Sequence, residues 1–193
     1  MRILPTLTLM IVASPTLAQE DWPNAKTPML ETSALGINVA VPAPEWIGEA
    51  MSDPGYENAE GISASWFIGG GFDIRGSSVN VTIQTMDAWE QGAQVHSFGY
   101  DASSCETLAY PRPAHLDDVF EFTVVCGRDY GTGRGVIYYG QARQVGDDHV
   151  VDVWYVTEVD PFSANDPATW PMPEAELTAM WERLRAAITV TSP

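Results

Sequence analysis

The sequence predicts an α+β domain, in which an antiparallel sheet is flanked by helices and an amphipathic C-terminal helix packs on the sheet. Three observations support this class. Several segments of about eight residues alternate apolar and polar side chains, the pattern of half-buried strands. The connections between the last three of these segments are short and rich in Gly and Asp, as in an antiparallel meander. Near the C-terminus, apolar residues recur at helical spacing.

The first half of the chain contains three alternating segments, each bounded by proline or glycine. The strands predicted there are residues 35–42, 61–68 and 78–86. Gly69 to Gly71 permit the backbone angles of a tight turn. A short helix follows, because Asp87 and Glu90 have the spacing of a capping box, and we expect it to run to about residue 98.

The second half contains four further alternating segments and a helix. The predicted strands are residues 105–110, 119–126, 135–143 and 149–158. Pro173 suits the first position of a helix, with Glu174 and Glu176 in its first turn. The apolar stripe that follows is Leu177, Met180, Trp181, Leu184 and Ile188. We expect this stripe to pack on the sheet.

The N-terminal residues are typical of a secretory signal peptide. Arg2 precedes an apolar run, and the small residues of Thr16-Leu17-Ala18 form a cleavage site. The run is too short, and too interrupted by proline, to span a membrane. The predicted domains are a signal peptide over 1–18, a disordered leader over 19–34 and a single α+β domain over 35–193. The mature protein is expected to be periplasmic or secreted, without membrane insertion.

Charge and cysteine content limit the partners. The net charge is −17 and Lys26 is the single lysine, so a nucleic-acid partner is not expected. Cys105 and Cys126 are an even pair in a chain predicted to be exported, which predicts one disulfide. Two thiolates without neighbouring histidines do not complete a zinc site, so we expect no metal.

A candidate ligand site comes from the predicted hairpin at residues 135–158. A two-residue turn at Gly146-Asp147 places Gln141 opposite Asp152, and a three-residue turn would reverse the faces. The polar set then expected on one sheet face is Tyr139, Gln141, Arg143, Asp152 and Trp154. Two interpretations stay open. The set is either a small-ligand site or a structural Arg143–Asp152 ion pair under a helix.

No motif of known chemistry accompanies this set. The chain has no Gly-x-Ser-x-Gly element, and Gly69 to Gly71 lack the lysine of a phosphate loop. His149 and Asp152 point to opposite faces of a regular strand, while His96 and His115 stand alone in the sequence. We therefore predict no catalytic residue and no cofactor.

The order of elements resembles a known family. A strand over Gly36–Pro42, Trp46 shortly after it, an antiparallel meander and a final amphipathic helix are similar to the PsbP-like family of exported α/β/α sandwich proteins. The resemblance implies an assembly or binding factor, since the family members whose roles are understood are mostly not enzymes.

The sequence thus predicts an exported, non-enzymatic binding or assembly module of the bacterial cell envelope, with an envelope protein or a small ligand as partner. The alternative is a small periplasmic hydrolase or metal-dependent enzyme with a site around Asp152, formed with Arg143 and Glu121.

Overall fold

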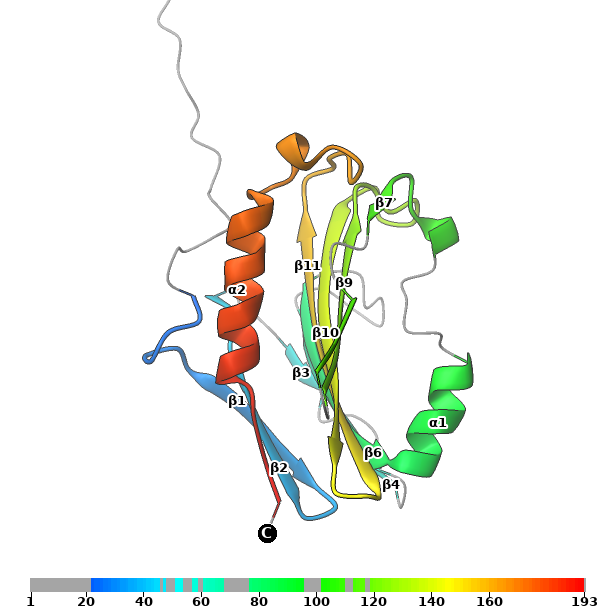
Figure 1. Cartoon of the computed structure of the whole chain (residues 1–193), viewed down its shortest axis with the longest axis vertical. Helices are drawn as coiled ribbons and strands as arrows, with labels where there is room; N and C mark the ends of the chain where they lie inside the picture. The colour runs from blue at the N-terminus through cyan, green and yellow to red at the C-terminus, as the bar shows by residue number, and fades with distance from the viewer. Residues whose placement is uncertain are drawn as a thin grey trace, which may run out of the picture.

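In a computed structural model, the described residues of the chain form two antiparallel sheets and two α-helices, which confirms the predicted α+β class (Figure 1). The structure describes residues 22–45, 47, 51–53, 57–58, 61–67, 77–95, 102–109, 113–116 and 119–192. The predicted signal peptide, Trp46, the Gly69–Gly71 turn and His96 lie outside these residues. Of the helices that the structure describes, none has both the length and the apolar character needed to cross a membrane.

The large sheet has the strand order β3-β5-β6-β11-β10-β9-β7, with β4 paired to β5 and β8 paired to β9. Its strands are β3 (Met51–Asp53), β4 (Glu57–Asn58), β5 (Gly61–Phe67), β6 (Ser78–Thr85), β7 (Leu108–Ala109), β8 (Pro113–Leu116), β9 (Val119–Cys126), β10 (Gly135–Val145) and β11 (His149–Val159). All pairs are antiparallel, so the predicted meander of 119–126, 135–143 and 149–158 is confirmed. The predicted strand at 105–110 is shorter than expected, and Cys105 makes only an isolated bridge to Asp129.

The small sheet has the order β1-β2-β12 and corrects one prediction. Its strands are β1 (Met29–Ala34), β2 (Ile37–Pro42) and β12 (Thr189–Thr191). The prediction of a disordered leader over 19–34 is wrong for residues 29–34, because β1 pairs with β2 along its whole length. The hairpin turns at Leu35 and Gly36, both with positive φ. The domain therefore begins before residue 35.

Trp22 ties the start of the described chain to the core. Its indole Nε1 donates to the carbonyl of Ala43 over 3.0 Å, and its ring meets Tyr155 edge-on with centroids 6.1 Å apart. The Trp22 carbonyl accepts from Arg183 Nε over 3.1 Å. The mostly polar composition of residues 19–34 predicted disorder and did not reveal this contact, because a single aromatic residue makes it.

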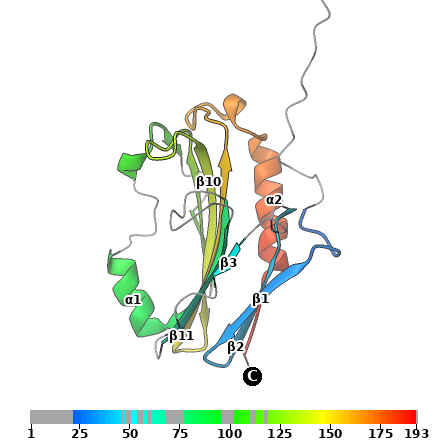
Figure 2. The ribbon, with the colours of Figure 1, turned by 180° about the vertical axis from the view of Figure 1, so that it is seen from behind.

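The two faces of the large sheet are covered differently. Helix α2 (Glu174–Ala187) and the small sheet lie on one side, and helix α1 (Met86–Val95) lies on the other (Figures 1 and 2). The short 3₁₀ helices η2 (Ala102–Ser104) and η3 (Pro167–Thr169) lie in the connections. We call the two sides of the sheet the α2 side and the α1 side.

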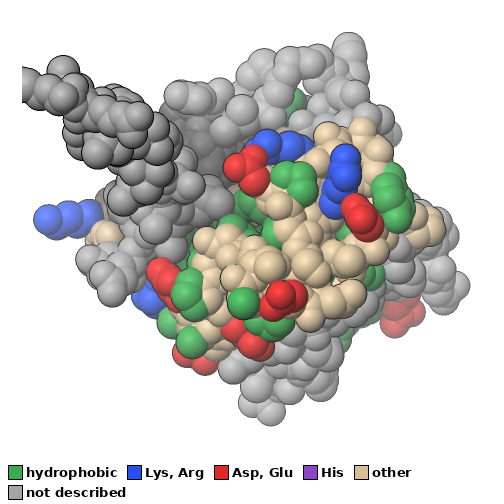
Figure 3. Space-filling view, turned by 90° about the horizontal axis from the view of Figure 1, so that it is seen from above, with side chains coloured by type: hydrophobic (Ala, Val, Ile, Leu, Met, Phe, Trp, Pro, Cys, Tyr) green, Lys and Arg blue, Asp and Glu red, His purple; other side chains and the backbone are tan. Residues whose placement is uncertain are grey.

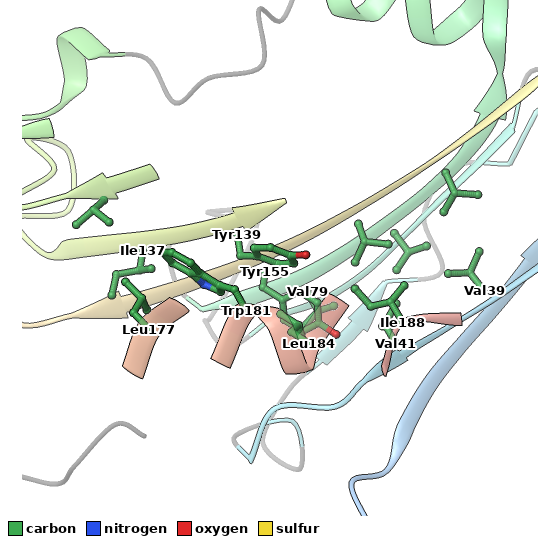
Figure 4. Close-up of a cluster of buried hydrophobic side chains, with 14 of the residues drawn as sticks. Val39, Val41, Val79, Ile137, Tyr139, Tyr155, Leu177, Trp181, Leu184 and Ile188 are labelled. Carbon is green, nitrogen blue, oxygen red and sulfur yellow. The ribbon is translucent and has the colours of Figure 1, made fainter. Parts of the chain in front are cut away.

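The main core lies on the α2 side (Figure 4). Alternate residues of β6 and β11 point there and are buried, namely Val79, Val81, Ile83, Val151, Val153 and Tyr155. From α2, the predicted stripe contributes Leu177, Trp181 and Leu184, and Ile188 follows as the C-cap residue. Trp181 stacks on Tyr139 with ring centroids 6.3 Å apart. Packing of the C-terminal helix on the sheet is thereby confirmed.

Helix α2 begins one residue later than predicted, and helix α1 begins two residues earlier. Pro173 is the N-cap of α2 and not its first helical residue. In α1, Met86 is already helical, and the Thr85 hydroxyl accepts from the Ala88 N–H over 3.3 Å. Thr85 therefore caps α1 in place of the predicted Asp87, because its side chain is the one that reaches the free amide.

Cys105 and Cys126 form the predicted disulfide, with Cα atoms 5.9 Å apart. They form a small buried cluster with Val136. At this end of the molecule, charged groups of both signs are interspersed on the surface (Figure 3). Two exposed ion pairs join nearby segments, Arg128 with Glu106 and Arg134 with Asp160, at 3.9 and 2.9 Å.

Candidate functional site

The turn between β10 and β11 decides which candidate residues share a face. Val145 pairs with His149, so three residues, Gly146 to Asp148, form the turn. Gly146 adopts a positive φ of 62°. The residue opposite Asp152 is consequently Ala142 and not Gln141. The predicted two-residue turn is wrong, and the shift of one residue moves one strand's side chains to the other face.

The five predicted ligand residues therefore divide between the two sides of the sheet. Tyr139, Gln141 and Arg143 lie on the α2 side, whereas Asp152 and Trp154 lie on the α1 side. Arg143 and Asp152 are not neighbours on one face, so the predicted ion pair is wrong. The alternative enzyme site around Asp152 cannot include Arg143 and Glu121, because both lie on the other side of the sheet.

On the α2 side, polar side chains from β9, β10 and α2 converge within the apolar core. We call this group the α2-side cluster; its members are Glu121, Tyr139, Gln141, Arg143, Trp181 and Arg185. Glu121 lies opposite Gln141 in the β9–β10 register. Trp181 and Arg185 lie four residues apart on α2 and so share a helix face. Three of the five predicted ligand residues belong to this cluster.

Tyr139 is at the centre of the cluster. Its Oη lies 3.4 Å from both Glu121 Oε1 and Gln141 Oε1, and its single proton serves one acceptor at a time. Burial and the neighbouring Glu121 carboxylate raise the pKa of Tyr139 well above its usual range. Glu121 also forms an ion pair with Arg185, whose Nη1 lies 3.5 Å from Glu121 Oε2. Tyr139 therefore stays a neutral hydroxyl beside an ion pair.

Three buried N–H groups of the cluster have no hydrogen-bond acceptor in the described part of the chain. They are Gln141 Nε2, Arg143 Nε and Trp181 Nε1. Gln141 is only 1% exposed and Trp181 only 4%. Buried polar groups in folded proteins are almost always paired, and an unpaired one costs about 1–3 kcal/mol. All three are donors, so the cluster has an excess of N–H groups over acceptors.

On the α1 side, the buried polar group is an acceptor, the Asp152 carboxylate, and its hydrogen-bond donors are present. Its carboxylate is buried, and its two oxygens accept from Gln84 Nε2 over 2.8 Å and from Trp89 Nε1 over 3.3 Å. Burial raises the pKa of Asp152 to about 6, and the two hydrogen bonds partly offset that rise. Trp89 belongs to α1, so Asp152 holds this helix against the sheet.

Trp154 lies beside Asp152 on the same face and is packed by Phe122. Their ring centroids are 4.5 Å apart in an edge-on arrangement. The Phe122 ring lies directly over Gly140, where a Cβ atom would meet Phe122 Cζ at 2.0 Å. Gly140 therefore makes the space in which the Phe122 ring reaches Trp154.

The comparisons with known proteins are limited to distant structural similarity. No protein-family model matches the sequence. No curated protein matches it either. Among solved structures, a point mutant of the protein Mog1 aligns with a TM-score of 0.45 at 10% identity, covering 84% of this chain and 95% of that chain. The Saccharomyces cerevisiae Ran-binding protein Mog1p aligns with a TM-score of 0.44, at the same identity and coverage. Similarity at this level supports no argument about function.

A metal centre has no donor set in the residues that the structure describes. Within those ranges, His, Cys, Asp and Glu side chains do not gather in groups of three or more that could hold a metal ion.

Sequence reasoning missed side chains that take part in the α2-side cluster and in the surroundings of Asp152. Arg185 was not singled out, although its spacing of four from Trp181 places it on the helix face that meets the sheet. Gln84 lies on the polar side of β6, where alternation predicts a wet face, and instead it is half-buried against Asp152. The signal for that contact was weak, because β6 and β11 are far apart in the sequence and their register is set by the fold.

Proposed function

We propose that this chain is an exported, non-enzymatic binding module of the bacterial cell envelope, and that its ligand contacts the α2-side cluster. The observation that carries the proposal is the set of three buried N–H donors without acceptors on Gln141, Arg143 and Trp181. Their combined cost is a large fraction of the net stability of an ordinary domain. A ligand that supplies acceptors would remove this cost, which makes binding favourable.

The depth of the cluster favours a small ligand over an envelope protein. Gln141 and Trp181 are almost fully buried, so a protein surface would not reach their N–H groups. Arg143 is half-buried and the Arg185 side chain is 38% exposed, so these residues are the members of the cluster nearest to solvent, and a small molecule would enter beside them. Pockets that are mostly buried and have a few convergent polar groups are typical of small-molecule sites.

Export is supported by the charged start, apolar run and small-residue exit of residues 1–18. We also propose a relation to the PsbP-like family, supported by the order of the strand, the meander and the final helix. Fractionation of the native host and the mass of the purified chain test export. A mature N-terminus at Gln19 in the periplasmic or secreted fraction is the expected result, and a full-length chain in the cytoplasm would contradict it.

Binding is tested on protein purified from its native compartment, both as isolated and after incubation with the low-molecular-weight fraction of envelope extract. Native mass spectrometry is expected to show added mass on the wild type, and thermal unfolding is expected to show a raised melting temperature. Gln141→Leu should lose both effects. Gln144→Leu is the matched control, because Gln144 is exposed on the same strand, and it should keep both. A wild type that gains neither mass nor stability contradicts the proposal.

A further inference from the structure

We infer that the α2-side cluster binds the carboxylate group of a small organic acid, with Gln141, Arg143 and Trp181 donating to its oxygens. This inference rests on the proposed binding function and names the ligand class for the same site.

The unpaired groups define the chemistry of the ligand. Each of them is an N–H donor, and among the described residues the buried side-chain atoms without partners include no acceptor. A hydroxyl or amide ligand would bring its own donors into a site that already has too many. A carboxylate brings acceptors only, with two oxygens and about four lone-pair sites. Three donors from three side chains are within what one carboxylate accepts.

Arg143 supplies the charge. Its guanidinium has no acidic partner in the described part of the chain, whereas Arg185 is already engaged by Glu121. The unpaired atom is Nε, one edge of the planar fork with which arginine binds carboxylates through two parallel hydrogen bonds. Charge-assisted bonds of this kind are stronger than bonds between neutral groups.

The surrounding charge favours a carboxylate over a phosphate. The whole chain carries a net charge of −17, and the Glu121 carboxylate lies within the cluster, next to Tyr139. A dianionic phosphate would be repelled more strongly than a singly charged carboxylate by both. Among the described residues of the cluster, Arg143 is the cation without an acidic partner, so a single negative charge is the one that the cluster neutralises.

The rest of the ligand would meet an aromatic surface. Trp181 and Tyr139 stack at 6.3 Å and form the apolar side of the cluster (Figure 4). Aromatic and aliphatic surface around a few fixed polar groups is the usual composition of a small-ligand site. A carboxylate with an apolar tail is therefore expected to bind more tightly than acetate.

The experiment compares sodium acetate, butyrate and benzoate with sodium phosphate and sodium chloride on the full mature chain, by thermal unfolding and titration calorimetry. The carboxylates are expected to raise the melting temperature in a saturable way, with benzoate or butyrate exceeding acetate. Phosphate and chloride at equal ionic strength should not do so. Equal effects of all five salts would show an ionic-strength effect and overturn the inference.

Variants locate the site. Gln141→Leu and Arg143→Gln should each weaken carboxylate binding by about 10- to 100-fold, the effect of one lost hydrogen bond to a charged group. Arg143→Lys keeps the charge and removes the fork, so it should also lose most of the affinity. Gln144→Leu should bind as the wild type does. Carboxylate binding that is unchanged in both Gln141→Leu and Arg143→Gln would overturn the inference.

Failure of this inference differs from failure of the proposed function. If none of the carboxylates binds, but native protein retains a small molecule that Gln141→Leu loses, the ligand class is wrong and the binding function stands. If phosphate binds saturably and the carboxylates do not, the charge argument is wrong. If native protein retains nothing and no probe binds, both are overturned.

Discussion

The two sides of the large sheet treat buried polar groups in opposite ways. On the α1 side, the Asp152 carboxylate is a buried acceptor that is matched by donors from Gln84 and Trp89. On the α2 side, Gln141, Arg143 and Trp181 present buried donors that nothing in the described chain accepts. A matched group holds the fold together, whereas an unmatched group lowers stability unless a ligand completes it. In our proposal, this difference gives the α1 side a structural role and the α2 side a ligand-binding role.

The largest effect is expected from Trp181→Ala. Trp181 is 4% exposed and stacks on Tyr139, so truncation leaves a cavity and should cost about 3–5 kcal/mol in unfolding free energy. Urea denaturation measures it. Trp181→Phe is the sharper variant, because it keeps a ring and removes the N–H donor. It should retain most of the stability and lose carboxylate affinity; a large loss of stability in Trp181→Phe would mean that the indole N–H is matched after all.

Removal of the disulfide is expected to be the next largest effect. The disulfide joins two cysteines that are 21 residues apart in the sequence. It lies at an end of the sheet where the buried apolar cluster around it is small. Closing such a loop stabilises by about 3 kcal/mol in the chain-entropy model. The Cys105→Ser, Cys126→Ser double variant should therefore unfold at lower urea, and carboxylate binding at the distant α2-side cluster should survive below the midpoint. Stability equal to the wild type would show that the bridge constrains little.

Asp152→Asn tests the α1 side, through the pH dependence of the free energy of unfolding. Burial raises the pKa of Asp152 from 3.8 to about 6, so between about pH 4 and 6 the folded state binds more protons than the unfolded state. The stability due to this proton is fully present below about pH 4 and is lost as pH rises through 6. Asn does not titrate. The stability advantage of the wild type over the variant should therefore shrink by about 2 kcal/mol from pH 4 to pH 7. A constant difference across this range argues that Asp152 is solvated or ion-paired.

Among the variants of buried residues, Gln141→Leu is expected to have the smallest effect on stability. The substitution removes an unpaired donor and keeps a similar volume, and Tyr139 can still donate to Glu121. The ligand-free variant should be as stable as the wild type or more stable by about 1 kcal/mol. Gln144→Leu on the exposed side should change stability by less than about 0.5 kcal/mol. If Gln141→Leu lowered the unfolding free energy by more than about 2 kcal/mol, the Gln141 amide would have to be hydrogen-bonded in the folded protein. The distinction between the two sides of the sheet would then be lost.

Periodicity predicted most of the fold. Strands β5, β6, β9, β10 and β11 and helix α2 lie within a few residues of the expected places, because alternation and helical spacing are local properties of the sequence. Strand β1 was missed, since its alternation is weak and its pairing with β2 depends on a turn at Leu35 and Gly36.

The candidate site was half predicted, for a geometric reason. Tyr139, Gln141 and Arg143 were grouped correctly because residues of one strand that are two apart share a face in any register. Asp152 and Trp154 were assigned to the wrong face, because that assignment depended on the number of residues in a turn. The sequence from Gly146 to Asp148 suits turns of either length.

The β10–β11 turn has a consequence for insertions and deletions. Surface loops ordinarily tolerate changes in length. Here, removal of one residue between Val145 and His149 would rotate β11 by one position against β10, and the Asp152 carboxylate would enter the core beneath α2 while Val151 and Val153 turned outward. Odd changes of length at this tip should therefore be excluded in any functional variant, although the side chains of the exposed Asp147 and Asp148 are free to vary; Gly146 is held by its positive φ.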